Sequence, residues 1–213
     1  MLEKGYVSQN SKTVTHHDPL KFRLHCRGAA SRHRILQAAV VHVDQATETE
    51  AWSSYVRLRW PWQRLGPRHV HGIRRATLRG APSMAEALVQ LAAQVDGALV
   101  TAHNAAFDTE FIRAASRFAP PDAQHVLLRA TDAALCTLEL SRATDPERLR
   151  SHRLGDLCEY YGVTLDQPHD ALHDARATAA IVPKLFADLG IESMAQLDPF
   201  IVRAQSPVGA RSA

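Results

Sequence analysis

The sequence predicts an α/β fold with a mixed sheet flanked by helices. Three strand-like segments come first, and strand-like and helix-like segments alternate after them. Chains whose elements follow this order form layered α/β domains. Of the 213 residues, 46% are hydrophobic and 22% are charged, which are the proportions of a globular chain with a core of its own. This composition excludes a wholly disordered chain.

The first three segments have the spacing of strands. Apolar and polar residues alternate over residues 22–27, as in a strand with one buried face. Residues 35–43 (ILQAAVVHV) are mostly apolar, which predicts a buried strand. Residues 51–58 (AWSSYVRL) predict a third strand. The connections between them are short, so we expect an antiparallel meander.

A long connection, a helix and a strand–helix pair come next. Residues 59–82 are rich in proline, glycine and arginine, which predicts an irregular segment. Ser83 and Glu86 have the spacing of a capping box, and apolar residues recur after them at helical intervals. Residues 98–102 (ALVTA) predict a short buried strand, and residues 103–108 (HNAAFD) open the next helix.

Helical patterns dominate the C-terminal part of the chain. Residues 120–128 begin with two prolines, and we expect a loop and the start of a strand there. A helix is expected from about Asp132, and residues 153–161 and 170–189 predict two amphipathic helices.

The pattern divides the chain into three regions. We expect a polar N-terminal tail (residues 1–17), a domain (18–190), and a C-terminal extension (191–213) with about one helical turn and a frayed end. No apolar run approaches the roughly 20 residues that span a bilayer, and the N-terminus lacks the apolar stretch of a signal peptide. The three cysteines have no CxxC spacing. The sequence therefore predicts a cytoplasmic protein without a membrane partner, a disulfide framework or a cysteine zinc site.

The net charge of +3 is unevenly distributed. Residues 1–79 contain 14 Lys and Arg against 5 Asp and Glu, whereas residues 80–213 contain 11 against 17. Arginine accounts for 21 of the 25 basic residues, and its planar guanidinium suits phosphate binding. The basic half indicates a polyanionic partner such as nucleic acid. A general preference for arginine on a solvated surface is the alternative explanation.

Two segments carry side chains with catalytic potential. HNAAFD, which ends in Asp108, lies where a buried strand meets a helix, and ligand sites of α/β sheets gather at such strand ends. In PHDALHDA, Pro168 favours a break before the helix, which places His169 on a loop and Asp174 within the helix. A histidine and an aspartate in this arrangement can act as a base and a metal ligand. Each segment alone is also explained as a helix cap or as surface residues; their joint occurrence favours a site.

With these segments in place, the sequence resembles the DEDDh 3′–5′ exonucleases, in particular the proofreading subunit of the bacterial replicative DNA polymerase. The resemblance covers about residues 20–188. It rests on the following stretches: RILQAAVVHVD (34–44), VHGI (70–73), the capped helix after residue 82, LVTAHNAAFD (99–108), LCTLELSR (135–142), RLGDLCEYYGV (153–163) and HDALHDA (169–175).

The resemblance implies a ribonuclease-H-like fold and hydrolysis of phosphodiesters by two divalent metals, Mg²⁺ or Mn²⁺, about 4 Å apart. Four carboxylates hold the metals in the family, and a histidine is the general base. The resemblance makes Asp108 and Asp174 metal ligands and His169 the base. It makes Asn104 and His71 candidates for substrate binding. The implied partners are single-stranded DNA 3′ ends and a DNA polymerase subunit.

The chain departs from the family in its first motif, D-x-E-T-x-G, which supplies two of the four carboxylates. Gly28 matches the glycine of the motif, but Arg23 and His25 occupy the positions of the aspartate and the glutamate. Residues two apart on a strand point to the same face, so a cation and an imidazole take the place of two anions. The loss of both carboxylates disfavours metal binding.

Three other acidic residues are candidates for a replacement ligand: Asp18, Glu48 and Glu50. Asp18 precedes the strand, and the two glutamates follow the second strand, so we expect none of them at the site. An alternative explanation is that residues 1–33 are not the natural sequence.

Two function hypotheses follow. One is a 3′–5′ exonuclease that acts on DNA ends in proofreading or repair. The other is a catalytically dead pseudo-exonuclease that binds nucleic acid or protein. In the second case we expect Arg23 to occupy the metal position and to pair with Asp174 or Asp108, with His25 beside it. The alternative for Arg23 is a side chain turned to solvent. For Phe107 we expect a place in the core rather than beside a substrate.

Overall fold

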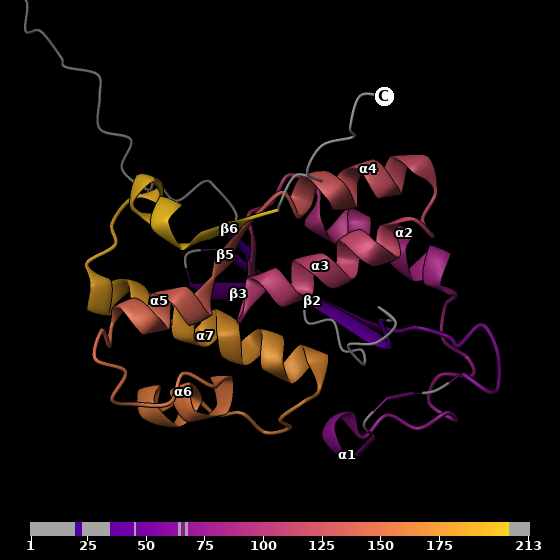
Figure 1. The fold of residues 1–213 in the computed structure, drawn as a ribbon, viewed down its shortest axis with the longest axis horizontal. Coiled ribbons are helices and arrows are strands. Elements are labelled where there is room, and N and C mark those ends of the chain that lie inside the picture. The colour runs from indigo at the N-terminus through magenta and orange to yellow at the C-terminus, as the bar shows by residue number, and fades with distance from the viewer. Residues whose placement is uncertain (1–19, 23–34, 45, 64, 67, 205–213) are drawn as a thin grey trace, which may run out of the picture.

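The computed structural model describes residues 20–22, 35–44, 46–63, 65–66 and 68–204. In this part of the chain a six-stranded sheet has the strand order β3-β2-β1-β4-β5-β6, with helices on both of its faces (Figure 1). The strands are β1 (Leu20–Phe22), β2 (Gln37–Asp44), β3 (Thr47–Tyr55), β4 (Val100–Ala102), β5 (Ala133–Cys136) and β6 (Ile201–Arg203).

The sheet is mixed, as predicted. β1, β2 and β3 pair antiparallel, as expected for a meander. Of the first predicted strand, residues 22–27, only Phe22 lies within the described residues. β1 also pairs parallel with β4, where Phe22 lies opposite Thr101, and β4 pairs parallel with β5. β6 returns antiparallel to β5. β1 therefore joins the antiparallel half of the sheet to the parallel half.

Seven α-helices and one 3₁₀ helix are present in the described residues. They are α1 (Arg68–His71), α2 (Met84–Val95), α3 (Ala105–Ser116), α4 (Pro121–Ala130), α5 (Thr137–Ala143), α6 (Leu154–Tyr161), α7 (Ala171–Leu189) and the 3₁₀ helix η1 (Met194–Phe200). The capping box of α2 is confirmed, because Ser83 N donates to Glu86 Oε2 (2.7 Å) and Glu86 N donates to Ser83 Oγ (3.3 Å). None of these helices is long and apolar enough to cross a membrane.

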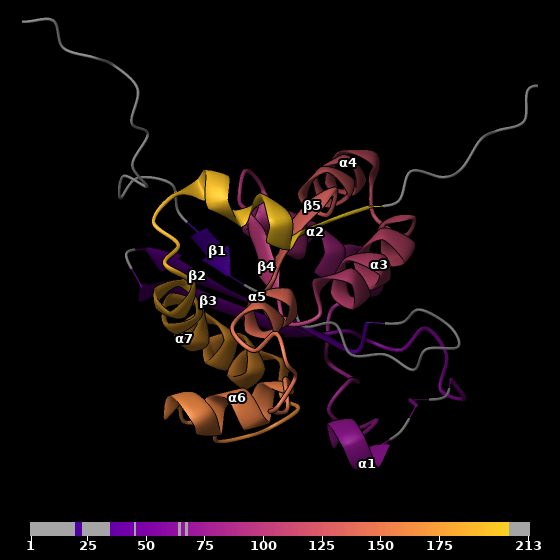
Figure 2. The ribbon, with the colours of Figure 1, turned by 60° about the vertical axis from the view of Figure 1, so that its left-hand side comes forward.

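The core lies in two layers, one on each face of the sheet. β2 is buried along almost its whole length, as its apolar sequence predicts. Its side chains alternate between the layers: Ala38 and Val40 pack with α2, α3 and α4, whereas Val41 and Val43 pack against α7. Figure 2 shows α7 on one side of the strands and α3 and α4 on the other. Burial on both faces fixes the register of β2, since a slip by one residue would exchange the two sets.

Two predictions in the C-terminal part are wrong. Residues 120–128 are not a loop and strand but belong to helix α4. Pro121 occupies the first helical position, where the backbone N–H that proline lacks would have no partner within the helix. The residues after Asp132 form β5 before α5 begins at Thr137. β5 has only four residues, and helical and strand periodicities cannot be told apart over so short an apolar run.

Two further elements differ in extent. The third strand spans Thr47–Tyr55 rather than residues 51–58, and its first five residues are exposed because β3 is an edge strand. The segment expected as an extension after residue 190 contributes η1 and β6, so it is part of the same sheet. The irregular connection over residues 59–82 is confirmed, apart from the single turn of α1.

Candidate active site

A cleft of about 830 Å³ opens at the carboxyl ends of β4 and β5. Parallel strands of α/β sheets present ligand sites at this edge. The first turns of α3 and α7, the segment before α6 and the loop before α7 surround the cleft. Its lining residues are His103, Asn104, Phe107, Asp108, Leu138, Arg142, Ser151, His152, Arg153, Leu154, Gly155, Asp156, Leu165, Pro168, His169 and Asp174.

Asp108 enters the cleft from the start of α3. β4 ends at Ala102, and the chain turns into the helix at Asn104, whose φ of 64° lies in the left-handed region that asparagine tolerates. Asp108 then falls in the first turn and is only 2% exposed. The positive end of the helix dipole stabilises a carboxylate at that position.

The next parallel strand ends beside Asn104. Ala102 of β4 lies opposite Cys136 of β5, so the residues that follow the two strands are neighbours. His103 Nδ1 accordingly lies 3.0 Å from the Thr137 hydroxyl. This contact joins the start of α5 to the turn between β4 and α3, the helix that carries Asp108.

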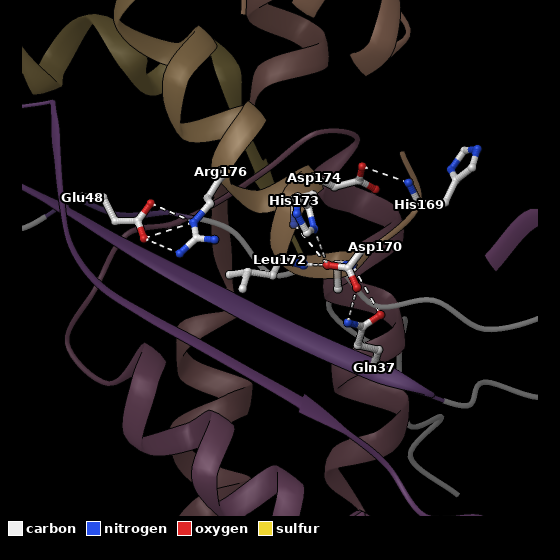
Figure 3. Close-up of polar contacts among 9 residues, drawn as sticks. Gln37, Glu48, His169, Asp170, Leu172, His173, Asp174 and Arg176 are labelled. Atoms are coloured by element: carbon white, nitrogen blue, oxygen red, sulfur yellow. Dashed lines mark hydrogen bonds and ion pairs between the residues drawn. The ribbon is translucent and has the colours of Figure 1, made fainter. Parts of the chain in front are cut away.

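Asp174 and His169 enter the cleft from the start of α7. The helix begins at Ala171, so His169 precedes it and Asp174 lies in its first turn, as the sequence predicts. Asp174 is 4% exposed, whereas the His169 ring is exposed. The two are tied together because the His169 backbone N–H donates to Asp174 Oδ1 (3.2 Å; Figure 3). His169 has a φ of 78°, which is uncommon for a bulky side chain.

A second aspartate fixes the position of this helix start. Asp170 is the N-cap of α7 and accepts from the backbone N–H groups of Leu172 (2.9 Å) and His173 (3.2 Å). Its other oxygen accepts from Gln37 Nε2 of β2 at 2.9 Å (Figure 3). Burial alone would raise the pKa of Asp170, but the hydrogen bonds from Gln37, His173 and the backbone lower it below its usual value. The sheet and the helix start are therefore joined through one carboxylate.

Two arginines and a histidine that sequence reasoning missed also line the cleft. Arg142 from α5 and Arg153 at the N-cap of α6 line it together with His152. His152 Nδ1 lies 2.8 Å from the buried Ser141 hydroxyl, and burial lowers the pKa of His152. In the sequence, the available signal for these residues was the segment SHRL just before a helix. Only the fold brings this segment to the same cleft as Asp108.

Of three other residues considered from the sequence, Asn104 and Phe107 line the cleft and His71 does not. His71 is not among the residues that line the cleft; its Nδ1 accepts from Ile73 N and its Nε2 donates to the Leu65 carbonyl, both at 3.0 Å. Phe107 was expected in the core but is 39% exposed and lines the cleft, because the buried face of α3 is taken by Phe111. Asn104 lines the cleft as expected.

The acidic alternatives do not reach the cleft in the described residues. Glu48 binds Arg176 through contacts of 2.8–3.1 Å, on the opposite side of α7 from Asp174 (Figure 3). Glu50 is exposed on the edge strand β3. Asp18, Arg23 and His25 lie outside the described residues, as does the expected pairing of Arg23 with Asp108 or Asp174.

The donor set limits the metal that the described residues can hold. In residues 20–22 and 35–204, apart from the undescribed positions 45, 64 and 67, there is no group of three or more His, Cys, Asp and Glu side chains arranged to bind a metal. Asp108 and Asp174 supply two buried carboxylates, and Mg²⁺ is commonly held by one or two carboxylates with water and phosphate oxygens. These residues fit one divalent cation and do not fit the two-metal centre of four carboxylates.

Comparison with known proteins agrees with this arrangement. A family model described as exonuclease matches residues 24–182. The chain belongs to the DEDDh 3′–5′ exonuclease family. Members of this exonuclease family use divalent metals.

The exonuclease family relatives include large polymerases. The DNA polymerase III PolC-type of Staphylococcus saprophyticus is 31% identical over 182 residues, which are 84% of this chain and 12% of that protein. The protein of the same name from Caldanaerobacter subterraneus is 31% identical over 140 residues, 64% of this chain and 9% of that protein. The chain thus spans about a tenth of the length of these curated relatives.

Solved exonuclease structures share the fold. Exonuclease X in complex with 5′ overhanging duplex DNA has a TM-score of 0.61 and 21% identity, over 85% of this chain and 98% of that one. The nuclease domain of 3′hExo, a DEDDh family member bound to rAMP, has a TM-score of 0.62 and 15% identity, over 82% and 94%. The predicted ribonuclease-H-like α/β fold is confirmed by these likenesses.

Proposed function

We propose that this exonuclease-family chain acts on the 3′ ends of nucleic-acid strands, with the terminal phosphodiester in the cleft at the ends of β4 and β5. The observation that carries the proposal is the convergence of two buried carboxylates, Asp108 and Asp174, with His169 on one cleft. The two aspartates lie in the first turns of two different helices, α3 and α7, so the fold rather than the local sequence brings their carboxylates to one cleft.

Each of these residues has a role that its position supports. Asp108 and Asp174 would hold one divalent cation, Mg²⁺ or Mn²⁺, which when bound supplies Lewis-acid activation of a phosphodiester. His169 is exposed at the cleft and can accept a proton from a water molecule there. Arg153 can bind phosphate oxygens through paired hydrogen bonds. Arg142 can do so with the N–H groups that its ion pair with Glu139 (2.6 Å) does not use.

A second candidate function is binding of 3′ ends without hydrolysis. It is favoured by Arg23 and His25 at the first-motif positions and by the donor set of the described residues, which fits one cation rather than two. In this function Arg142 and Arg153 in the cleft contact the strand end, which is held but not cut. A DNA polymerase assembly is the partner that the PolC-type relatives suggest.

Hydrolysis and binding are separated by one experiment. Oligonucleotides of DNA and RNA, labelled at the 5′ end and either free or blocked at the 3′ end, are incubated with excess protein and Mg²⁺ or Mn²⁺. Hydrolysis predicts stepwise shortening of the free 3′ ends only. That shortening should disappear in Asp174→Asn and persist in Glu110→Gln, which neutralises an exposed carboxylate on the same helix as Asp108.

The binding function predicts no shortening and a measurable affinity that a 3′ block weakens. If the chain neither shortens nor binds any of these strands, both candidates are contradicted. Shortening that survives in Asp174→Asn contradicts the assignment of the site.

A further inference from the structure

A second, smaller groove lies apart from the cleft, beside the segment that joins β3 to α2. Its volume is about 250 Å³. It is lined by Ile35, Leu36, Val56, Arg57, Leu58, Arg59, Trp60, Gln63, Met84 and Phe118. Among these described residues two are charged, and both are arginines. The groove thus combines an apolar floor with a positive rim.

Trp60 lines this groove, and Trp62 stacks on it. Trp60 is 46% exposed and Trp62 is 75% exposed, and their rings stack with a centroid distance of 5.4 Å and an angle of 13°. The guanidinium of Arg59 lies 5.4 Å from the centroid of Trp60. Large aromatic side chains left in water next to one another mark interaction surfaces rather than core packing.

The segment that carries the tryptophans is held in place. The Arg75 guanidinium donates to the backbone carbonyls of Pro61 and Gln63. The backbone N–H of Gln63 donates to the carbonyl of Trp60 at 3.1 Å, which closes a turn between the two rings. The stacked pair is therefore presented by a turn whose backbone is held in place, so little backbone freedom is lost when a ligand binds.

The groove and the cleft are connected through α3. Phe107, in the first turn of the helix, lines the cleft, and Phe118, just beyond its last turn, lines the groove. At 1.5 Å per residue these positions lie about 16 Å apart along the helix axis. A strand at the 3.4 Å spacing of a duplex covers that distance with about five nucleotides. A single strand whose end lies in the cleft is long enough to reach the tryptophans after a few residues.

We propose that Trp60 and Trp62 form a stacking surface for unpaired bases of the nucleic-acid strand whose 3′ end occupies the cleft. This inference rests on the proposed function and adds a second contact to it. Proteins that bind single strands pair stacking aromatic rings with a positive groove that follows the phosphates. Arginines placed at the groove supply that charge: Arg57 and Arg59 line it, and the Arg117 guanidinium lies 4.8 Å from the ring centroid of Phe118, which also lines it. This charge favours a nucleic acid over a protein segment as the occupant.

The test compares strand lengths. A trinucleotide fits the cleft alone, whereas a dodecamer also reaches the tryptophans. Anisotropy titrations of both, labelled at the 5′ end and measured in EDTA, use the full chain and the variant Trp60→Ala with Trp62→Ala. We expect the variant to bind the dodecamer about fivefold or more weakly and the trinucleotide as the wild type does. Leu149→Ala, which removes an 81% exposed side chain elsewhere, is the matched control and should change neither affinity.

Intrinsic fluorescence gives a second readout. Trp52 packs against the core, so Trp60 and Trp62 are the exposed tryptophans. The dodecamer should quench the wild-type emission, and the trinucleotide should not. Equal binding of the dodecamer by the wild type and the variant overturns the inference and leaves the surface to a protein partner. An equal loss for both lengths also overturns it. A wild type that binds neither strand, in EDTA or after Mg²⁺ is added, contradicts the proposed function itself.

Discussion

Two residues beside the candidate site adopt backbone conformations that side chains rarely take. Asn104, with a φ of 64°, directly precedes the start of α3, and His169, with a φ of 78°, lies two residues before the start of α7; Asp108 and Asp174 enter the cleft from these two helix starts. The left-handed conformation at each position turns the chain from strand or loop into the helix. The direction of the two carboxylates therefore depends on a conformation that most residues resist.

The first prediction concerns Asn104. Asn104→Gly should leave the free energy of unfolding nearly unchanged, because glycine adopts a positive φ freely. Asn104→Val should lower it by about 1–2 kcal/mol, since a β-branched side chain clashes in this conformation. Urea unfolding followed by circular dichroism measures both. Equal stability of the two variants would show that the position imposes no such constraint.

The second prediction concerns the departure from the family's first motif. β1 pairs parallel with β4, the strand that leads to Asp108, at Phe22 and Thr101. In the sequence the first-motif positions begin with the next residue, Arg23. Restoring both carboxylates with Arg23→Asp and His25→Glu should create Mn²⁺ binding, while either single change should do little. Calorimetric titration with Mn²⁺ measures this. A folded double variant that binds no more Mn²⁺ than the wild type would refute the alignment of Arg23 and His25 with the aspartate and the glutamate of the first motif.

At the scale of elements, the start of α7 is held by Asp170. Its carboxylate caps the helix and binds Gln37 on β2, so one side chain joins helix and sheet. The pKa of Asp170 is lowered in the folded chain, which means that the folded state favours the ionised form. This stabilisation is present above the unfolded pKa near 4 and is lost as the pH falls through the lower folded value.

The third prediction follows from that cap. Asp170→Ala should lower the free energy of unfolding by about 1–2 kcal/mol at neutral pH. The difference from the wild type should shrink as the pH falls below about 4, because the wild-type carboxylate is then protonated. Urea unfolding at several pH values measures it. Asp166→Ala, an exposed position upstream of the cap, is the control and should cost much less. A difference independent of pH would show that the charge of Asp170 does not contribute.

Elements with strong local signals were predictable, and those without them were not. The capping box of α2 and the break before α7 each lie within a few residues, so the sequence displays them. α4 begins at a proline that also suggests a loop, and β5 is too short to show a period. The edge strand β3 starts with polar residues because only the fold decides which strand lies at the edge.

At the scale of the molecule, the predicted site was incomplete for a similar reason. Asp108, His169 and Asp174 belong to short motifs and were found from the sequence. Arg142 carries no local pattern, and the only signal at His152 is its place just before a helix; both reach the cleft because α5 and α6 pack at the strand ends. The groove at Trp60 likewise joins segments far apart in the chain.

The uneven charge of the whole chain leads to the last prediction. The basic excess lies in residues 1–79, so binding of single-stranded DNA should release counterions. The logarithm of the binding constant should then fall linearly with the logarithm of the salt concentration. Each arginine that contacts a phosphate contributes about 0.7 to the slope for a single strand. Arg59→Gln and Arg74→Gln should each reduce the slope by about that amount. Lys184→Gln removes the same charge from the exposed surface of α7, in the acidic half of the chain, and should leave the slope unchanged. Titrations of one oligonucleotide over a series of salt concentrations measure the slopes, and a slope near zero, or an equal change in all three variants, would contradict a localised phosphate-binding surface.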